Sequence, residues 1–262
     1  MTTTIAVANQ KGGVGKTTTA VNLGACLAQA GRNVVLIDLD AQCNLTTHLG
    51  IDSPESESAT TYALLLDKTA SARDLLVAVA PNLSVVPGHI ALAEVDLKLH
   101  TVMNGHTRLK RALAGLNADY VLIDCSPSLG LSTLNAFTAA SHLIIAIQTN
   151  WFAFEALRRL MFIVEDVLDE ANPELVVYAL ATLHRTNVNN SRDVLAKIQE
   201  TFKDLSLDST IRQNATLAEA AAARQTIVDY ANGSRGHKDY QALAEEIVKR
   251  VERTEGAKTR QA

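Results

Sequence analysis

The stretch Asn9-Gln10-Lys11-Gly12-Gly13-Val14-Gly15-Lys16-Thr17-Thr18 decides how this chain folds around its amino-terminal strand. The apolar run Ile5-Ala6-Val7-Ala8 comes directly before it, and a segment with apolar residues at helical spacing follows over residues 17–30. A strand, a glycine-rich loop and a helix start, in this order, are the setting that a phosphate-binding loop requires. The glycines let successive backbone N–H groups point at phosphate oxygens, and the positive end of the helix adds to that field.

Two side chains at the end of this loop add a positive charge and a metal-binding hydroxyl, which the backbone lacks. The Lys16 ammonium is expected to neutralise the outer phosphates of a nucleotide, and the Thr17 hydroxyl is expected to ligate the accompanying Mg²⁺. The predicted nucleotide-binding residues of the loop are Lys11, Gly12, Gly13, Val14, Gly15, Lys16, Thr17 and Thr18. The alternative, a glycine-rich turn with two solvated lysines, does not account for the strand and the helix on either side.

Lys11 distinguishes this loop from the general pattern. That pattern has glycine five residues before Gly15, where this chain has Gln10 followed by Lys11. Two lysines in one phosphate loop are unfavourable unless both meet negative charge. Because Lys16 already covers the phosphates from within, Lys11 is expected to reach phosphate elsewhere, for example in a facing subunit.

Length, composition and charge narrow the class of protein. The 262 residues are 47% apolar and 20% charged. These values favour one domain that comprises residues 1–262, with a flexible tail after about residue 253, rather than two small domains. The formal net charge of −4 excludes DNA binding by bulk charge, so contacts to nucleic acid would need a few placed side chains. No signal peptide or membrane span is predicted, and three scattered cysteines are typical of the reducing cytoplasm.

Short apolar strands alternate with amphipathic segments along most of the chain. Strands are predicted over residues 5–8, 34–38, 83–86, 120–124, 142–148 and 176–182, and helices over residues 17–30, 107–116, 131–140, 153–168, 191–202 and 236–251. Several strands are continuous Val/Ile/Leu runs, as in parallel sheets covered on both faces. The sequence therefore predicts an α/β fold, with a doubly wound, mostly parallel sheet and helices on both faces.

Three aspartates end two of these strands, and ligands of such sheets bind at the carboxyl ends of strands. Asp38 and Asp40 follow one apolar run, and Asp124 follows another. Asp124 has the position of a carboxylate that faces Mg²⁺ and its water in phosphate-transferring enzymes. Each aspartate taken alone is also compatible with a turn residue or a helix cap, but together with the loop they favour a site.

The roles at this site follow from what phosphoryl transfer needs, namely positioning and neutralisation of charge. The predicted catalytic residues are Lys11, Lys16 and Asp40, with Asp40 orienting the attacking water. The predicted metal residues are Thr17 and Asp124, acting directly or through water. Asp38 is expected to hold other residues of the site in place without contacting the ligand itself.

The remaining chemically distinctive residues have plainer expectations. The histidines and cysteines lack metal-ligand spacing, so no structural zinc or iron–sulfur site is expected. Cys43 and Cys125 are expected to be small apolar core residues. Trp151 and Phe152 follow a predicted strand, and we expect them in the core rather than as a stacking platform for bases.

Taken together, these residues resemble the ParA/Soj-type partition ATPases, within the deviant-Walker group of P-loop NTPases that also includes MinD. The resemblance covers almost the whole chain. It rests on Asn-Gln-Lys-Gly-Gly-Val-Gly-Lys-Thr-Thr-Thr at 9–19, Asp-Leu-Asp-Ala-Gln-Cys-Asn at 38–44, Ile-Asp-Cys-Ser-Pro-Ser-Leu-Gly at 123–130, Gln-Thr-Asn-Trp-Phe-Ala-Phe-Glu-Ala-Leu at 148–157, Leu-Ala-Glu-Ala at 217–220 and Tyr-Ala-Asn-Gly-Ser-Arg-Gly at 230–236.

The resemblance implies an ATPase cycle. Such proteins bind ATP with Mg²⁺ and form a homodimer with ATP sandwiched between the subunits, in which Lys11 would reach the partner's phosphates. The ATP-bound dimer binds DNA of the nucleoid without sequence preference, and a ParB-like activator stimulates hydrolysis that is weak without it. The cycle segregates a chromosome, a plasmid or another cargo in the cytoplasm. Because the chain starts almost at the loop, we expect the short kind without an amino-terminal helix-turn-helix.

Several positions depart from the family pattern. Cys43 stands where the family usually has the glycine of Pro-Gln-Gly, and Ile-Arg-Gln-Asn-Ala-Thr at 211–216 stands where it has Ile-Pro-Arg-Asn-Val-Arg. Asn214, an adenine contact by the resemblance, is kept, but both family arginines are displaced. Arg-Gln-Thr at 224–226 replaces Gly-Lys-Pro. The candidates to hold DNA phosphates instead are Arg185, Arg212 and Arg224.

Three rival functions share these motifs. A MinD-like ATPase would need a basic amphipathic helix at the carboxyl end, but the stripe Tyr240, Leu243, Ile247 and Val251 is predicted to be a core face, and no stable membrane binding is expected. A ParA-like protein that positions a protein cargo is equally compatible with the motifs. A nitrogenase-type reductase would need cluster cysteines, which the spacing does not offer.

Overall fold

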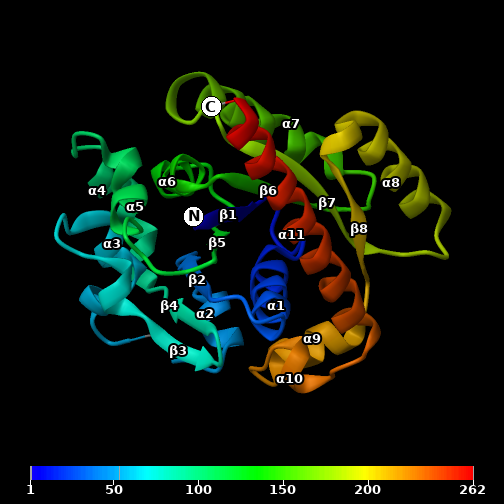
Figure 1. Ribbon diagram of the computed structural model, residues 1–262, viewed down its shortest axis with the longest axis horizontal. Helices are drawn as coiled ribbons and strands as arrows, with labels where there is room; N and C mark the ends of the chain where they lie inside the picture. Colours follow the sequence, from blue (N-terminus) through cyan, green and yellow to red (C-terminus); the bar gives the residue numbers. More distant parts are fainter. Residues whose placement is uncertain (1, 53, 262) are drawn as a thin grey trace.

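Residues 2–52 and 54–261 are described by the computed structural model, and these residues form one eight-stranded sheet in the order β3-β4-β2-β5-β1-β6-β7-β8 (Figure 1). The strands are β1 (Thr3–Ala8), β2 (Val34–Leu39), β3 (Val77–Ala80), β4 (Leu83–Val86), β5 (Tyr120–Cys125), β6 (His142–Gln148), β7 (Val176–His184) and β8 (Ser206–Arg212). Strand β3 runs antiparallel to β4, and the other neighbours pair in parallel. The mostly parallel sheet confirms the predicted fold class.

Helices cover both faces of this sheet. One face carries α1 (Lys16–Gln29), α2 (Asn44–His48), α9 (Ala215–Ala222), α10 (Ile227–Tyr230) and α11 (Arg235–Gln261). The other carries α3 (Thr61–Leu66), α4 (Val95–Leu99), α5 (Arg108–Ala112), α6 (Leu131–Ala139), α7 (Ala153–Asp166) and α8 (Asn189–Phe202). Short 3-10 turns lie at Glu57–Ala59, Ala72–Leu75, Ile90–Glu94, Gly105–Thr107 and Lys203–Leu205, and a π turn at Val167–Ala171 extends α7.

The two layers of the core are separated by the alternation of side chains along each strand. In β1, Ile5 and Val7 pack under α1 and α11, whereas Ala6 and Ala8 pack under the helices of the opposite face. Strands β1, β2 and β5 are buried along their whole length. Continuous apolar runs are therefore required there, and this is why these three strands could be recognised in the sequence.

The edges of the sheet differ from the prediction. Strands β3 and β8 were not predicted, because β3 is only four residues long and β8 mixes polar residues with apolar ones. The helix expected over residues 107–116 is limited to Arg108–Ala112, because Gly115 adopts a left-handed conformation with φ of 74°. Helix α11 continues to Gln261, ten residues past its predicted end; flexibility of the tail stays a prediction.

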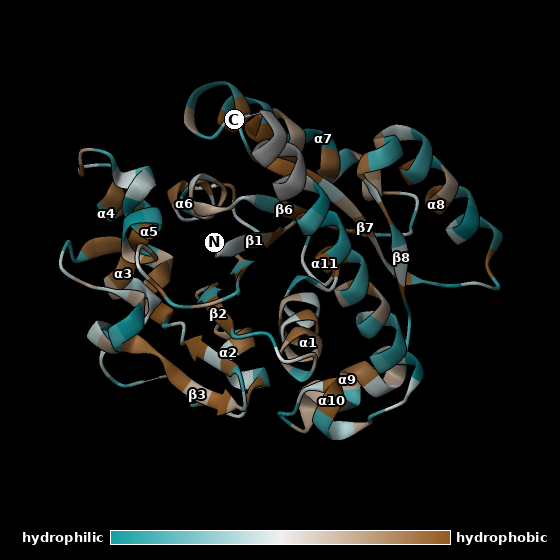
Figure 2. Ribbon diagram, viewed as in Figure 1, coloured by the Kyte–Doolittle hydropathy of each residue, from teal (hydrophilic) through white to brown (hydrophobic). Residues whose placement is uncertain are grey.

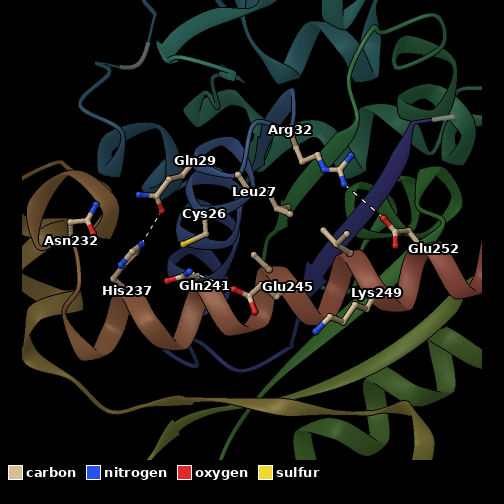
Figure 3. Close-up of a pocket in the computed structure, with 13 residues that line it drawn as sticks. Cys26, Leu27, Gln29, Arg32, Asn232, His237, Gln241, Glu245, Lys249 and Glu252 are labelled. Atoms are coloured by element: carbon tan, nitrogen blue, oxygen red, sulfur yellow. Dashed lines mark hydrogen bonds and ion pairs between the residues drawn. The ribbon is translucent and has the colours of Figure 1, made fainter.

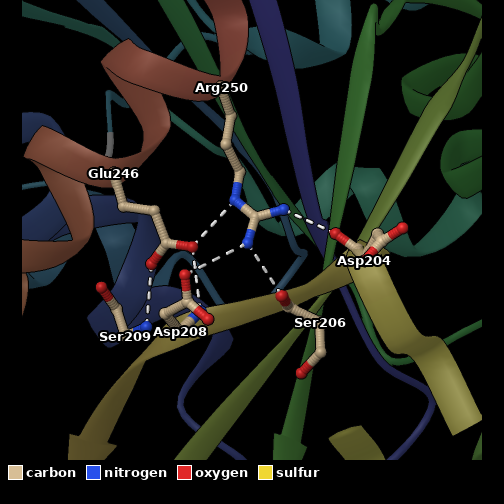
Figure 4. Close-up of polar contacts among 6 residues, drawn as sticks. All are labelled: Asp204, Ser206, Asp208, Ser209, Glu246 and Arg250. Atoms are coloured by element: carbon tan, nitrogen blue, oxygen red, sulfur yellow. Dashed lines mark hydrogen bonds and ion pairs between the residues drawn. The ribbon is translucent and has the colours of Figure 1, made fainter. Parts of the chain in front are cut away.

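Helix α11 covers the exposed edge of β8. The Glu246 carboxylate accepts hydrogen bonds from the backbone N–H groups of Asp208 (2.9 Å) and Ser209 (2.8 Å). Arg250 donates to Glu246 (2.8 Å) and to the carbonyl oxygens of Asp204 (2.7 Å) and Ser206 (2.9 Å), as Figure 4 shows. Unpaired strand edges invite pairing with other chains, and this network occupies the edge.

Helix α11 also packs against α1. The stripe formed by Tyr240, Leu243, Ile247 and Val251 is at most 3% exposed, so the predicted core face is confirmed. Its outward side is hydrophilic (Figure 2). A groove of about 670 Å³ lies between the two helices, and the pairs Gln29–His237 and Arg32–Glu252 cross it (Figure 3). Within the described part of the chain, no helix combines the length and the apolar character needed to cross a membrane.

Candidate active site

The glycine-rich loop between β1 and α1 is held in place by the strands beside it. Asn9 donates to the carbonyl oxygen of Ala146 in β6 (2.7 Å), and its own side-chain oxygen accepts from the backbone N–H of Lys11 (2.9 Å). Thr182 of β7 donates to the carbonyl oxygen of Val14 (2.8 Å). The loop is therefore shaped before any ligand arrives, which reduces the entropic cost of binding.

Two residues of the loop require glycine. Gly13 and Gly15 have φ of 72° and 91°, in the left-handed region where a side chain is strained. Gly15 is the last residue before α1, so this conformation turns the chain into the helix and leaves the first N–H groups of α1 open to an anion. The predicted strand, loop and helix are confirmed.

The loop forms one wall of a cleft of about 550 Å³. The cleft is lined by Gly12, Gly13, Gly15, Lys16, Thr17, Thr18, Asp40, Gln42, Asn44, Thr47, His48, Pro127, Leu183 and Ala221. Lys16 is only 7% exposed, and its ammonium lies 3.3 Å from the carbonyl oxygen of Lys11. A buried lysine is costly without an anionic partner, so this side chain is poised for phosphate.

Lys11 and Asn214, both predicted to bind nucleotide, do not line this cleft. The ammonium of Lys11 lies 3.4 Å from Oε1 of Gln148, at the end of β6. Asn214 caps α9, and its side-chain oxygen accepts from the backbone N–H of Thr216 (3.1 Å). Val14 was also predicted to bind nucleotide. Its side chain is buried, and its backbone carbonyl accepts the hydrogen bond from Thr182 that helps to hold the loop.

Asp124 is buried behind the cleft at the carboxyl end of β5. It is completely inaccessible, and neither carboxylate oxygen makes a hydrogen bond of good geometry with the described residues. Burial, followed by the charge of Asp38, raises the pKa of Asp124, while the Thr17 hydroxyl and Lys16 lower it. A buried carboxylate beside a hydroxyl is an oxygen donor set that fits Mg²⁺; that Thr17 and Asp124 hold this ion stays a prediction.

Asp38 and Asp40 have different environments, although they are two residues apart. Asp38 is completely buried and accepts from the backbone N–H and the hydroxyl of Thr46 (2.9 and 2.6 Å) and from the N–H of Asp40 (3.2 Å). Burial raises the pKa of Asp38 to about 6. Asp40 lines the cleft, and one of its oxygens accepts from the N–H of Gln42 (3.0 Å). Asp38 is thus held by hydrogen bonds within the chain, whereas Asp40 faces the cleft.

The three arginines predicted to contact DNA are not equivalent. Arg212 forms an ion pair with Asp239, a residue of α11 whose side chain is only 6% exposed. Arg224 pairs with Asp52 (2.7 Å) on the surface. Arg185 is exposed and donates to the neutral side chain of Gln213. Among the described residues, Arg185 therefore has no ion-pair partner, whereas Arg212 and Arg224 are each paired with an aspartate.

The placement of two aromatic residues contradicts the sequence prediction. Trp151 and Phe152 were expected in the core, but they are 75% and 69% exposed. Strand β6 ends at Gln148, and the turn that follows carries both side chains outward. In contrast, Cys43 and Cys125 are buried as expected.

Sequence reasoning also missed several residues of the cleft. Gln42, Asn44 and His48 come from the loop and short helix after Asp40, and Leu183 comes from the carboxyl end of β7. Thr182, which holds the loop, lies beside Leu183. The signal that could have found this threonine is its place near the carboxyl end of a predicted strand, where ligands of such sheets bind.

The sequence of this chain is similar to those of proteins with known names. The profile of the AAA domain family AAA_31 matches residues 2–177. The sporulation initiation inhibitor protein Soj of Bacillus subtilis is 39% identical over 247 residues, which is 93% of this chain and 97% of Soj. The chromosome partitioning protein ParA of Caulobacter vibrioides is 36% identical over 251 residues, which is 94% of either protein.

Solved structures of nucleotide-bound proteins share the fold of this chain. Cobyrinic acid a,c-diamide synthase from Mycobacterium smegmatis with bound ADP and magnesium has a TM-score of 0.83 at 34% identity, over 96% of both chains. A putative plasmid partition protein from Borrelia burgdorferi bound to AMPPNP has a TM-score of 0.82 at 25% identity, over 95% of this chain and 100% of that one. The shared fold, the shaped phosphate loop and the similarity along nearly the whole sequence place this chain in the family of ParA/Soj-type ATPases.

Proposed function

We propose that this chain hydrolyses ATP with Mg²⁺ in the cleft beside the glycine-rich loop. The observation that carries the proposal is Asp124, a buried carboxylate that makes no hydrogen bond of good geometry with the described residues and is placed next to Thr17 and Lys16. Burying such a carboxylate lowers the stability of the folded protein, so a purely structural role does not explain it. A cation held by Thr17 and Asp124 offsets that cost.

Each residue of the cleft then has a role in the transfer. The N–H groups of the loop and the Lys16 ammonium hold the phosphates and neutralise the charge that develops on them. Asp40 orients the attacking water, since its carboxylate faces the cleft and is fixed by the N–H of Gln42. Mg²⁺, when bound, supplies Lewis-acid stabilisation of the phosphate oxygens. Asn214 contacts the adenine from the start of α9.

The hydrolysis drives a partition cycle. Two ATP-bound copies form a homodimer in which Lys11 of one copy reaches the phosphates held by the other, and the dimer binds DNA of the nucleoid without sequence preference. Hydrolysis is weak until a ParB-like activator stimulates it, and the protein is then released. Two observations support this cycle: the names of its relatives refer to partitioning of chromosomes and plasmids, and Lys11 is not among the residues that line its own cleft.

Sedimentation with DNA tests the DNA-binding step of the cycle. The purified chain is mixed with random-sequence duplex DNA and Mg²⁺, with ATP, with ADP or without nucleotide. Retention on DNA is expected only with ATP and is expected to fall steeply with salt, because phosphate contacts release counterions. Equal retention in all three conditions, or none in any, would refute the ATP-dependent DNA step. Replacing DNA with anionic lipid vesicles tests the MinD-like alternative.

A further inference from the structure

A groove of about 780 Å³, which we call the α6–α7 groove, lies between α6 and the carboxyl-terminal half of α7 (Figure 1). The end of α4 and the turn before α5 form its other wall, through His100 and His106. Its apolar lining consists of Leu129, Leu131, Leu134, Ile163, Val167 and Ala171, and its acidic residues are Asp166 and Glu170. None of the described residues that line this groove also lines the nucleotide cleft, so the groove is a separate site.

Exposed apolar side chains flank the α6–α7 groove. Phe162, one turn before Asp166 on α7, is 66% exposed, and Leu97, three residues before His100 at the end of α4, is 77% exposed. Residues three or four apart lie on the same side of a helix, so both side chains extend the apolar surface beyond the groove. Apolar residues exposed singly are ordinary, but an apolar groove with apolar flanks indicates a contact with another molecule.

Hydrogen bonds fix one wall of the groove to α6. Asp96 of α4 accepts from the backbone N–H of Ser132 at the start of α6 (2.8 Å). Further along α6, the buried side chain of Asn135 accepts from the N–H of Leu109 (3.0 Å) and donates to the carbonyl oxygen of Gly105 (2.7 Å). This wall is therefore shaped before a partner arrives, which reduces the entropic cost of docking.

The opposite wall, formed by α7, is acidic. Residues 160–184 contain five carboxylates and no lysine or arginine, and both Asp166 and Glu170 are exposed. Within the part of the chain whose side chains the structure describes, neither forms an ion pair. Both lie near the carboxyl end of a helix, where the helix dipole disfavours negative charge, so a cation supplied by another molecule would be favoured here.

No lysine or arginine is among the described residues that line the α6–α7 groove. Arg158 and Arg159 are exposed nearer the start of α7, outside the groove. Lys98 of α4 is paired with Glu94 (3.2 Å), and Arg108 is only 5% exposed. The groove therefore suits a cationic partner and disfavours nucleic acid and anionic lipid, whose phosphates carry negative charge.

We propose that the α6–α7 groove docks a basic amphipathic helix of a partner protein. From Ile163 to Ala171, α7 spans about 12 Å, which accommodates about two turns of a helix with apolar anchors at i, i+3 or i+4 and i+7. The apolar side chains of the partner enter between Leu134 and Ile163, and its lysines or arginines pair with Asp166 and Glu170. Docking requires neither nucleotide nor hydrolysis, so the inference goes beyond the proposed function and is tested independently of it.

Selection from a phage-displayed library of random helical peptides identifies the chemistry that the groove prefers. The nucleotide-free wild type is used as bait beside a groove variant that combines Asp166→Lys with Glu170→Lys. We expect the wild type to enrich peptides that carry Lys or Arg beside apolar residues at helical spacing, and the groove variant to reject them. No enrichment by the wild type, or enrichment of the same peptides by both proteins, would overturn the proposal.

A matched variant separates the groove from charge in general. Glu165→Lys combined with Asp169→Lys makes the same exchange on the same helical segment, at exposed residues that do not line the groove. Fluorescence polarisation of the most enriched peptide is expected to show binding weakened about 10-fold or more by the groove variant and less than about threefold by the matched variant. Equal weakening by both would contradict the proposal.

The apolar part of the groove is tested by Leu134→Arg, which places a bulky cation between α6 and α7. It is expected to weaken peptide binding about 10-fold or more, with an unchanged thermal unfolding temperature as the folding control; unchanged peptide binding would overturn the proposal. Light scattering of the nucleotide-free wild type examines the other occupant. Self-association that the groove variant loses would assign the groove to a second copy of this chain instead.

Discussion

Asp38 and Asp124 occupy paired positions on the neighbouring strands β2 and β5, and both are completely buried. Thr46 and the backbone of Asp40 satisfy Asp38 with three hydrogen bonds. Asp124 receives none of good geometry from the described residues. The two carboxylates therefore differ in role: Asp38 fixes the loop that carries Asp40, and Asp124 is the one that we propose holds a cation.

Alanine substitutions at this pair are expected to change stability in opposite directions. Asp38→Ala removes the acceptor for three hydrogen bonds, leaves buried donors unsatisfied, and is expected to cost about 2–4 kcal/mol of the free energy of unfolding. Asp124→Ala removes a buried carboxylate that lacks a hydrogen bond of good geometry among the described residues, and it is expected to stabilise the ligand-free protein by about 1 kcal/mol. Urea denaturation of both variants without nucleotide or metal checks the signs; a loss of stability of similar size in both would contradict the division of roles.

Asp40 is expected to matter for turnover and not for binding. Asp40→Asn keeps an acceptor for the N–H of Gln42 but removes the negative charge that orients water. We expect hydrolysis to fall by about 100-fold or more, with ATP affinity changed less than about threefold. Phosphate release and ATP titration, measured on one preparation, separate these effects. Unchanged turnover would remove Asp40 from the chemistry.

The ion network on β8 predicts a loss of stability in acid. Burial alone would raise the pKa of Glu246, but its hydrogen bonds to Ser209 and Asp208 and the charge of Arg250 outweigh burial and lower it. A carboxyl whose pKa is lower in the folded state stabilises the protein above its unfolded pKa, and that contribution is lost as the pH falls through the folded pKa.

The Glu246→Gln variant tests this contribution. At pH 7 it is expected to be less stable than the wild type by about 1–2 kcal/mol, because charge-assisted hydrogen bonds are lost. The difference should shrink as the pH is lowered below the ordinary glutamate pKa of 4.5 and through the lower pKa of folded Glu246, because the wild-type carboxyl then becomes protonated as well. Urea denaturation across this pH range measures it, and a difference that does not depend on pH would show that the charge of Glu246 is irrelevant.

Arg185 and Arg212 are expected to affect different properties. Arg185→Ala should weaken retention on DNA and lower its salt dependence, with stability unchanged within about 0.5 kcal/mol. Arg212→Ala leaves Asp239 buried without its cation and should cost about 3 kcal/mol of stability. Co-sedimentation and denaturation of the two variants form a two-by-two comparison, and full DNA retention by Arg185→Ala would exclude Arg185 as a DNA contact.

The central strands and the phosphate loop could be predicted because one local pattern specifies each of them. A run such as Tyr120-Val121-Leu122-Ile123 is buried on both faces. The glycines before Lys16 are typical of a phosphate-binding loop, and two of them have positive φ. Edge strand β8 could not be predicted, since it mixes polar residues with apolar ones and one of its contacts, Glu246, lies 37 residues beyond Ser209.

Two substitutions show a further limit of sequence reasoning. Cys43 and Arg224 stand where the family usually has glycine, and both keep left-handed backbones, with φ of 51° and 57°. The family pattern identified the positions, but propensity alone would have predicted a different backbone there. In the same way, the exposure of Trp151 follows from where β6 ends, which its apolar neighbours do not indicate.

The central claim is that the cleft lined by Lys16 and Thr17, with Asp124 buried behind it, holds ATP with a divalent cation. Titration calorimetry tests it most directly. ATP is titrated into the wild type with and without Mg²⁺, with Lys16→Ala as the control that lacks the inner ammonium. We predict one ATP bound per chain, tighter binding with Mg²⁺, and no measurable binding to the variant. Absence of binding to the wild type in the presence of Mg²⁺, or equal binding to the variant, would contradict the account.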